Sequence, residues 1–129
     1  MNEPIFLSLA EVIALHDVQL AAFGGAAGLR DPGMLESAVA MPQMGFGEEY
    51  LHADLEEMAA AYLFHLVKNH PFVDGNKRVG FHAAYVFLEL NGMVLEMPEE
   101  VAYDLVIATA EGRATKAEIA ASFRAAVTT

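Results

Sequence analysis

The chain has 129 residues, a formal net charge of −11 and no cysteine. This length favours one domain, residues 1–129, with a buried hydrophobic core, and the lack of cysteine excludes disulfides and thiolate metal sites. The acidic composition argues against direct binding of nucleic acid or a membrane surface, and without a signal peptide or an apolar run of about 18 residues we expect a cytoplasmic protein.

Six helices joined by short connections are predicted in chain order. Capping boxes, in which Ser or Thr precedes Glu by three residues, open the first and the last helix, and an Asp N-cap opens the second and the third. Glycine, proline or an Asn-Gly pair ends most of them. The expected helices cover residues 9–23, 32–40, 55–69, 76–91, 98–112 and 116–127.

The connections differ in character. Residues 24–28 form a flexible glycine-rich turn, residues 43–52 form a loop that is the best candidate for a mobile flap, and residues 93–97 form a short extended piece. Helices 55–69 and 76–91 are apolar on nearly all sides, which is typical of buried helices. We therefore predict an all-α fold, a compact single-domain bundle in which these two helices form the core.

The loop between the two core helices has the sequence HPFVDGNKR and concentrates groups capable of chemistry. The first turn of the following helix has unpaired backbone N–H groups, and Gly75 before it allows a ligand to approach the backbone closely. Two cations in that turn make an anion favourable there, with phosphate the leading candidate. Asp74 beside a phosphate indicates a bridging Mg²⁺, and the imidazole of His70 is suited to accept a proton from a hydroxyl.

A phosphate site, a carboxylate and a base together indicate phosphoryl or nucleotidyl transfer to a hydroxyl. The alternative is a polar connection without chemistry, in which Asn76 caps the helix while Lys77 and Arg78 are solvated. In either case we expect Phe72 to point into the core and anchor the loop.

The loop resembles the core motif of the Fic/Doc superfamily, which has the general form H-[PI]-F-x-[DE]-[GA]-N-[GK]-R. Residues 24–38 are similar to the N-terminal half of death-on-curing (Doc) toxins, and residues 87–92 and 110–113 are similar to their C-terminal half. The resemblance extends over residues 5–124 and implies the helical fold of that family.

The resemblance also implies a role for each residue of the loop. His70 is expected to be the general base on a target hydroxyl, Phe72 the core anchor and Asp74 the ligand of Mg²⁺. The implied catalytic residues are His70, Asp74, Lys77 and Arg78, and those that hold the phosphates of ATP are Gly75, Asn76, Lys77 and Arg78.

Lys77 separates two activities within the superfamily. AMP-transferring Fic enzymes have glycine at this position, which leaves room for the nucleotide phosphates, and a lysine side chain obstructs that placement. In Doc-type members the nucleotide binds in the reverse sense and presents its γ-phosphate. The resemblance thus implies a protein kinase that uses ATP and Mg²⁺ to phosphorylate a threonine of elongation factor Tu and arrests translation. AMP transfer is the alternative activity, and a non-catalytic antitoxin-binding module is a third interpretation.

Regulation by a partner is a further implication of the resemblance. Many Fic proteins carry an inhibitory helix with the pattern [ST]-x-x-x-E-[GN], and the serine and threonine positions tested in this sequence do not fit it. Doc toxins are instead restrained by a small Phd-type antitoxin, whose disordered C-terminal segment folds on the toxin groove. We expect the same type of partner, and hence a type II toxin–antitoxin system.

Residues outside the loop carry lesser predictions. His16 belongs to an HD dipeptide of the kind found in metal-dependent phosphohydrolases, but no further ligands are evident, so we predict it at the surface or at a groove edge. His65 and His82 are interpreted as core histidines. Arg30 is expected to reach the antitoxin or the nucleotide, and Tyr50 to pack rather than contact a ligand.

Overall fold

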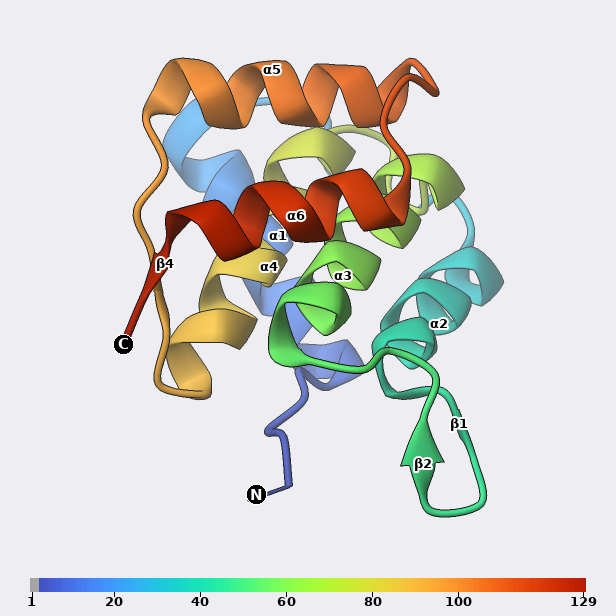
Figure 1. The fold of residues 1–129 in the computed structure, drawn as a ribbon. Helices are drawn as coiled ribbons and strands as arrows, with labels where there is room; N and C mark the ends of the chain where they lie inside the picture. The colour runs from blue at the N-terminus through green and yellow to red at the C-terminus, as the bar shows by residue number, and fades with distance from the viewer. Residues whose placement is uncertain (1–2) are drawn as a thin grey trace.

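The computed structural model describes residues 3–129, which fold mainly into α-helices (Figure 1). The helices are α1 (Leu9–Phe23), α2 (Pro32–Ala40), the short 3₁₀ helix η1 (Met41–Gln43), α3 (Leu55–Asn69), α4 (Asn76–Leu90), α5 (Glu99–Ala110) and α6 (Lys116–Ala126). The prediction of an all-α fold with six α-helices is confirmed for these residues. No helix in the described part of the chain has the length and apolarity needed to cross a membrane.

Two short antiparallel ladders accompany the helices. β1 (Gly45–Phe46) pairs with β2 (Glu49–Tyr50) in a hairpin, and β3 (Val94–Leu95) pairs with β4 (Val127–Thr128), which directly follows α6. The extended piece predicted at residues 93–97 contains β3. The sequence offers no signal for β4, because two residues are too few for an alternating pattern.

The helices begin where their capping residues predict. The hydroxyls of Ser8 and Thr115 each accept a hydrogen bond from the backbone N–H three residues on, and the glutamates at those positions accept a bond from the N–H of the capping residue. The carboxylates of Asp31 and Asp54 cap α2 and α3. Each cap satisfies a donor that the first helical turn leaves unpaired and contributes about 1 kcal/mol.

α3 and α4 form the centre of the hydrophobic core. Tyr62, Leu63 and Phe87 on these helices are fully buried, and burial of such side chains contributes about 1.5–3 kcal/mol each. The two helices approach closely at Gly80, where an added Cβ would lie 2.9 Å from Cγ2 of Val67. The loop that joins α3 to α4 therefore starts and ends on closely packed supports.

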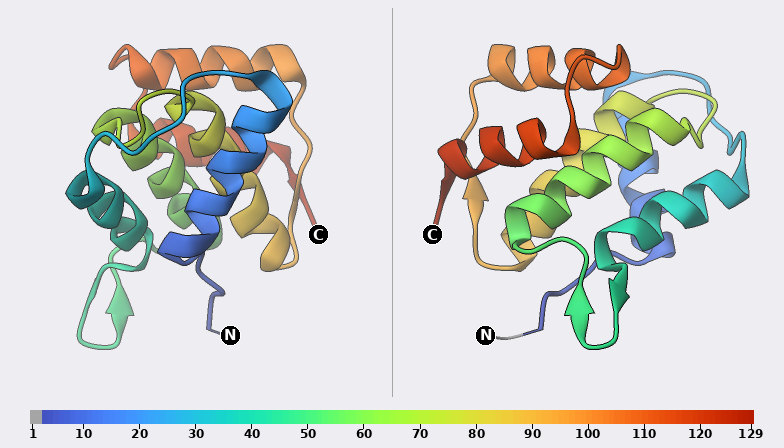
Figure 2. Two further views of the ribbon diagram at one scale, coloured as in Figure 1. Left: turned by 180° about the vertical axis from the view of Figure 1, so that it is seen from behind. Right: turned by 45° about the vertical axis from the view of Figure 1, so that its right-hand side comes forward.

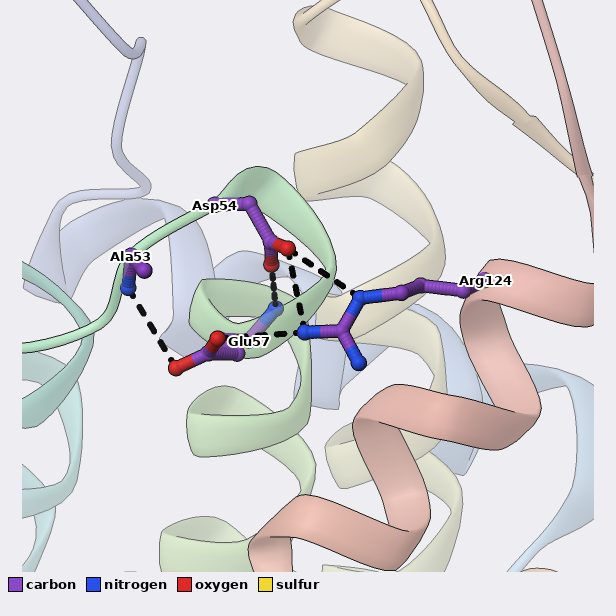
Figure 3. Close-up of polar contacts among 4 residues, drawn as sticks. All are labelled: Ala53, Asp54, Glu57 and Arg124. Atoms are coloured by element: carbon purple, nitrogen blue, oxygen red, sulfur yellow. Dashed lines mark hydrogen bonds and ion pairs between the residues drawn. The ribbon is translucent and has the colours of Figure 1, made fainter.

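α6 packs on α3, and an ion-pair cluster fastens one end of it (Figure 3). The guanidinium of Arg124 lies 3.0 Å from Oδ2 of Asp54 and 3.1 Å from Oε2 of Glu57. These side chains are between 34% and 42% exposed, so solvent screening keeps the contribution of the cluster to stability small. Burial of Ile119 and Phe123 on the inner face of α6 contributes more.

The β1–β2 hairpin projects from the end of the molecule opposite the α3–α4 loop (Figure 2, right). α3 has 15 residues and therefore separates the two ends by about 22 Å. Phe46 in the hairpin is 93% exposed, whereas Tyr50 places its ring 5.6 Å from that of Phe6 and donates a hydrogen bond to Glu3. The segment predicted as a loop is thus a hairpin remote from residues 70–78, and Tyr50 has the packing role expected of it.

Candidate active site

α3 ends at Asn69, and the residue after it, His70, adopts the left-handed helical conformation with φ 50° and ψ 53°. Among the described residues, it is the one non-glycine residue with positive φ. Pro71 disfavours a right-handed helical conformation at the residue before it, and the left-handed one costs about 1–2 kcal/mol. Surrounding contacts must therefore hold this abrupt turn, which leaves the imidazole of His70 exposed.

The connection between α1 and α2 runs beside the loop and supplies those contacts (Figure 2, left). Arg30 donates from Nε to the carbonyl of His70 at 2.7 Å and from Nη2 to the carbonyl of Asn69 at 3.0 Å. The carbonyl of Pro71 accepts bonds from the N–H of Arg30 and of the next residue. A cation is favourable at the C-terminal carbonyls of a helix. Arg30 therefore binds the loop itself, whereas the sequence predicts that it reaches a partner or the nucleotide.

Two side chains of the loop fix its internal shape. Phe72 is 2% exposed and anchors the loop in the core, as expected. The side-chain amide of Asn76 binds both backbone groups of Phe72, accepting from the N–H at 2.9 Å and donating to the carbonyl at 2.9 Å. Asn76 is 4% exposed, so its side chain is committed to the loop and its backbone N–H is what remains for a ligand.

His16 on α1 lies beneath the loop, and its prediction as a surface or groove-edge residue is wrong. Its side chain is 2% exposed, its ring stacks on that of Phe72 at a centroid distance of 3.7 Å, and its Nε2 lies 2.7 Å from the carbonyl oxygen of Asp74. The sequence contains one signal for this position. His16 follows the fully buried Val12 by four residues, and residues four apart share one face of a helix.

The carboxylate of Asp74 is held by two backbone N–H groups. Oδ2 accepts from Ala26 at 3.2 Å, and Oδ1 accepts from Gly75 at 2.8 Å. These two bonds lower the pKa of Asp74 from its ordinary value, and the charges of Arg78 and Lys77 lower it further. The carboxylate is therefore ionised near neutral pH and points along a fixed direction.

Asp74 suits a cation that arrives with other ligands. An ionised carboxylate that accepts two hydrogen bonds still has lone pairs for a cation. In residues 3–129 no group of three or more His, Asp or Glu side chains is placed to hold a metal ion. A cation at Asp74 would need phosphate or water oxygens to complete its coordination, which is usual for Mg²⁺. The donor set thus fits a Mg²⁺–nucleotide complex.

The N-terminus of α4 is the electropositive side of the site. Gly75 is its N-cap with φ 81°, no side chain caps the helix, and the first turn has no acidic residue. Lys77 and Arg78 in that turn are exposed, and the ion pairs found within residues 3–129 involve other basic side chains. The guanidinium of Arg78 lies 4.8 Å from the ring centroid of Phe23, a cation–π contact. This arrangement favours an anion.

A separate basic group lies between α3 and α6. Nζ of Lys116 is 3.1 Å from Nε2 of His65 and 3.4 Å from Nε2 of His52. Burial, reinforced by the charge of Lys116, lowers the pKa of His65 to about 4, and the same causes lower the pKa of His52. His65 is therefore neutral and partly buried, whereas the sequence predicts a core histidine, and it does not belong to the loop.

The predicted site residues all fall in the loop and in the first turn of α4. The loop's other supports come from α1 and the connection after it, and they are His16, Phe23, Ala26 and Arg30. The sequence assigns Arg30 to a partner or the nucleotide and does not assign the other three to the site. Helical spacing points to His16 alone, because the others act through a backbone N–H or through contacts between segments far apart in the chain.

This loop, set between two buried helices, defines the class of protein. Residues 6–88 match the Fic/DOC family, and the chain therefore belongs to the Fic/Doc family. It is similar to the protein kinase doc of Escherichia phage P1, with 35% identity over 119 residues that cover 92% of each chain. It is also similar to the toxin Doc of Mycolicibacterium smegmatis, with 42% identity over 90 residues that cover 67% of this chain and 69% of the relative.

Proposed function

We propose that the chain is a Doc-type toxin that acts as a protein kinase and transfers the γ-phosphate of ATP to a hydroxyl of a target protein. The observation that carries the proposal is the arrangement of the loop. An exposed imidazole stands at one end, an uncapped cationic helix N-terminus stands at the other, and the ionised Asp74 lies between them in the chain. The names of the two relatives, a protein kinase and a toxin, support the same activity.

The N-terminus of α4 receives the phosphates in this proposal. Backbone N–H groups of Asn76, Lys77 and Arg78 in the first turn of α4 face the anion, the side chains of Lys77 and Arg78 neutralise its charge, and Gly75, whose N–H binds Asp74, lets the phosphates approach the backbone. A chain with a net charge of −11 repels a nucleotide from most of its surface, so this local positive potential decides where the nucleotide binds. Asp74 holds Mg²⁺ together with the phosphates, and the ion, when bound, offsets charge on the transferred group.

His70 is the general base of the proposal. Its backbone is fixed by Arg30 and by the turn at Pro71, and its ring is exposed to an incoming protein. The imidazole accepts the proton of the target hydroxyl while the hydroxyl oxygen bonds to the γ-phosphorus. The bond between that phosphorus and the β–γ bridging oxygen breaks, and ADP leaves.

Lys77 determines which phosphate faces the target. It is the second residue of α4, in the turn proposed to receive the phosphates, and it is exposed. A glycine there would leave the N-terminus open to the phosphates in the orientation for AMP transfer, whereas a lysine fills that space and favours presentation of the γ-phosphate. The target we propose is a threonine of elongation factor Tu, whose phosphorylation arrests translation.

A Phd-type antitoxin is the partner we propose. α1 and the connection after it expose the apolar side chains of Val18 (56%), Phe23 (62%) and Leu29 (41%), and the loop itself exposes Val73 (48%). An amphipathic antitoxin segment that folds over this surface covers these side chains and closes the loop to its target.

Labelled ATP tests the activity. The purified protein, Mg²⁺ and elongation factor Tu are incubated with ATP labelled at either the α- or the γ-phosphate, with His70→Ala as control. Label from γ-ATP alone, lost in His70→Ala, is the expected result. Label from α-ATP would establish AMP transfer instead. Growth arrest that persists in cells expressing His70→Ala would support a non-catalytic module.

Lys77→Gly tests the orientation argument with the same two labels. We expect γ-phosphate transfer to fall at least about tenfold, because the nucleotide loses the side chain that selects its orientation and a cation near the phosphates. The matched control is Lys68→Gly, which removes an exposed cation from the last turn of α3. Transfer by Lys77→Gly at the rate of the unaltered protein would contradict the role given to Lys77.

A further inference from the structure

His16 makes contacts with the loop that hydrophobic packing alone does not explain. Its ring stacks on Phe72 with an interplanar angle of 7°, and its Nε2 lies 2.7 Å from the carbonyl oxygen of Asp74. A Cβ added to Gly75 would lie 3.4 Å from the same Nε2. One buried polar side chain of α1 thus contacts two residues of the loop and leaves little room beside a third.

The hydrogen bond identifies the ring nitrogen that donates toward the loop. A carbonyl oxygen accepts hydrogen bonds and cannot donate them, so Nε2 of His16 carries the proton and donates it to Asp74.

The bonded carbonyl belongs to the peptide unit between Asp74 and Gly75. In a trans peptide the C=O and the N–H point in opposite directions. His16 draws the carbonyl toward the core, so the Gly75 N–H points outward, where it binds Oδ1 of Asp74 at 2.8 Å. The orientation of this one peptide therefore sets both the direction of the carboxylate and the start of the α4 N-terminus.

We propose that His16 is a positioning residue, which holds the Asp74–Gly75 peptide so that the Asp74 carboxylate and the N-terminus of α4 have their productive directions. The proposal rests on the proposed function for its effect on phosphoryl transfer. His16 itself does not face the target or the nucleotide, because it is 2% exposed beneath Phe72.

Two substitutions separate the ring from the donor. His16→Phe keeps an aromatic ring against Phe72 and removes the donor, while His16→Gln supplies an N–H donor and removes the ring. We expect His16→Phe to lower kcat for γ-phosphate transfer at least about tenfold and to weaken Mg²⁺–ATP binding, because small displacements of reacting groups cost large factors in rate. His16→Gln is expected to recover part of the loss.

Val12→Ala is the matched control for loss of packing alone. Val12 is fully buried one turn earlier on the same face of α1. We expect its substitution to lower the thermal midpoint and leave kcat unchanged. If His16→Phe has the kcat and nucleotide affinity of the unaltered protein, or if Val12→Ala loses kcat to the same extent, the positioning role is overturned.

A measurement without turnover tests the same contact if no phosphoryl transfer is found. Long-range ¹H–¹⁵N correlation is expected to show a proton on Nε2 of His16, and hydrogen exchange of the Gly75 amide is expected to be at least about tenfold faster in His16→Phe, while amides of the α3 core keep their protection. Nε2 without a proton, or unchanged exchange at Gly75, would overturn the inference. Failure of transfer with these results intact would count against the proposed function alone.

Discussion

At the scale of single residues, the orientation of the Asp74 carboxylate depends on the backbone N–H of Ala26 and on the glycine that precedes it. Ala26 donates to Oδ2, and Gly25 just before it adopts φ 122°. A Cβ on Gly25 would lie 2.8 Å from that same oxygen. Position 25 therefore favours glycine for two reasons: its backbone has a positive φ, and a Cβ there would occupy the space of the carboxylate.

Substituting Gly25 by alanine is expected to impair the site beyond its effect on stability. The added methyl group displaces the Asp74 carboxylate, so we expect the apparent affinity for Mg²⁺–ATP to fall about tenfold. Isothermal titration with a non-hydrolysable ATP analogue and Mg²⁺ measures it.

Gly24→Ala is the matched control for this prediction. Gly24 also has a positive φ of 79°, but a Cβ there meets no atom within 4 Å. Both variants carry backbone strain of about 1–3 kcal/mol, seen as a lower free energy of unfolding. Equal loss of nucleotide affinity in the two would show that strain, and not contact with Asp74, is responsible.

At the scale of elements, the ends of the helices follow from the sequence, and the shape of the site does not. The capping boxes at Ser8 and Thr115 join residues three apart, so reading the sequence in order finds them. The bond from His16 to Asp74 spans 58 residues, and the bond from Ala26 to Asp74 spans 48. Such contacts leave no local pattern, and the Ala26 donor is a backbone N–H that any residue except proline provides.

The residues of the HPFVDGNKR motif can be found from the sequence, unlike His16 and Ala26, because they are neighbours in the chain. The concentration of functional residue types indicates His70 and Asp74, and the two lie in one loop because only three residues separate them in the chain. The side chain of Asn76 shows the limit of this reasoning. Its amide binds Phe72 instead of facing the solvent, and residue type alone does not distinguish the two orientations.

A side chain added at Gly80 is expected to weaken the contact between α3 and α4. Alanine raises helix propensity by about 1 kcal/mol over glycine. Its Cβ would, however, lie 2.9 Å from Cγ2 of the buried, β-branched Val67 and 3.3 Å from Cδ1 of Leu63, and such overpacking costs about 1–3 kcal/mol. We expect Gly80→Ala to be destabilised by about 1 kcal/mol net in urea unfolding.

The double variant Gly80→Ala/Val67→Ala checks the cause of that loss. Val67→Ala alone creates a cavity and is destabilising, but in combination the new methyl group occupies part of the vacated space. The two effects should therefore be less than additive by about 0.5–1 kcal/mol. Strict additivity would indicate that the Gly80 Cβ and Val67 do not meet.

At the scale of the whole molecule, the candidate site and the His65–Lys116 pair lie at different places along α3. The site begins at the C-terminal end of α3, where Arg30, Lys77 and Arg78 gather positive charge on an otherwise acidic chain. The side chains of His65 and Lys116 meet where α6 packs on α3. Stability can therefore be varied through His65 without replacing a residue of the site.

Acidification is expected to destabilise the fold through His65 before most carboxylates contribute. Burial lowers the pKa of His65 from an ordinary value of 6.5 to about 4, so between these values the unfolded chain binds more protons than the folded one. The contribution to stability is complete above pH 6.5 and is lost as the pH falls toward 4. Allowing for partial exposure of the ring, the loss from pH 7 to pH 5 is about 1 kcal/mol.

Urea unfolding at both pH values measures this loss of stability. His65→Gln should lose about 1 kcal/mol less over the same interval, because glutamine does not titrate. An equal loss in both proteins would assign the pH dependence to other groups, with His52, whose pKa is also lowered by burial, the first to substitute in the same way.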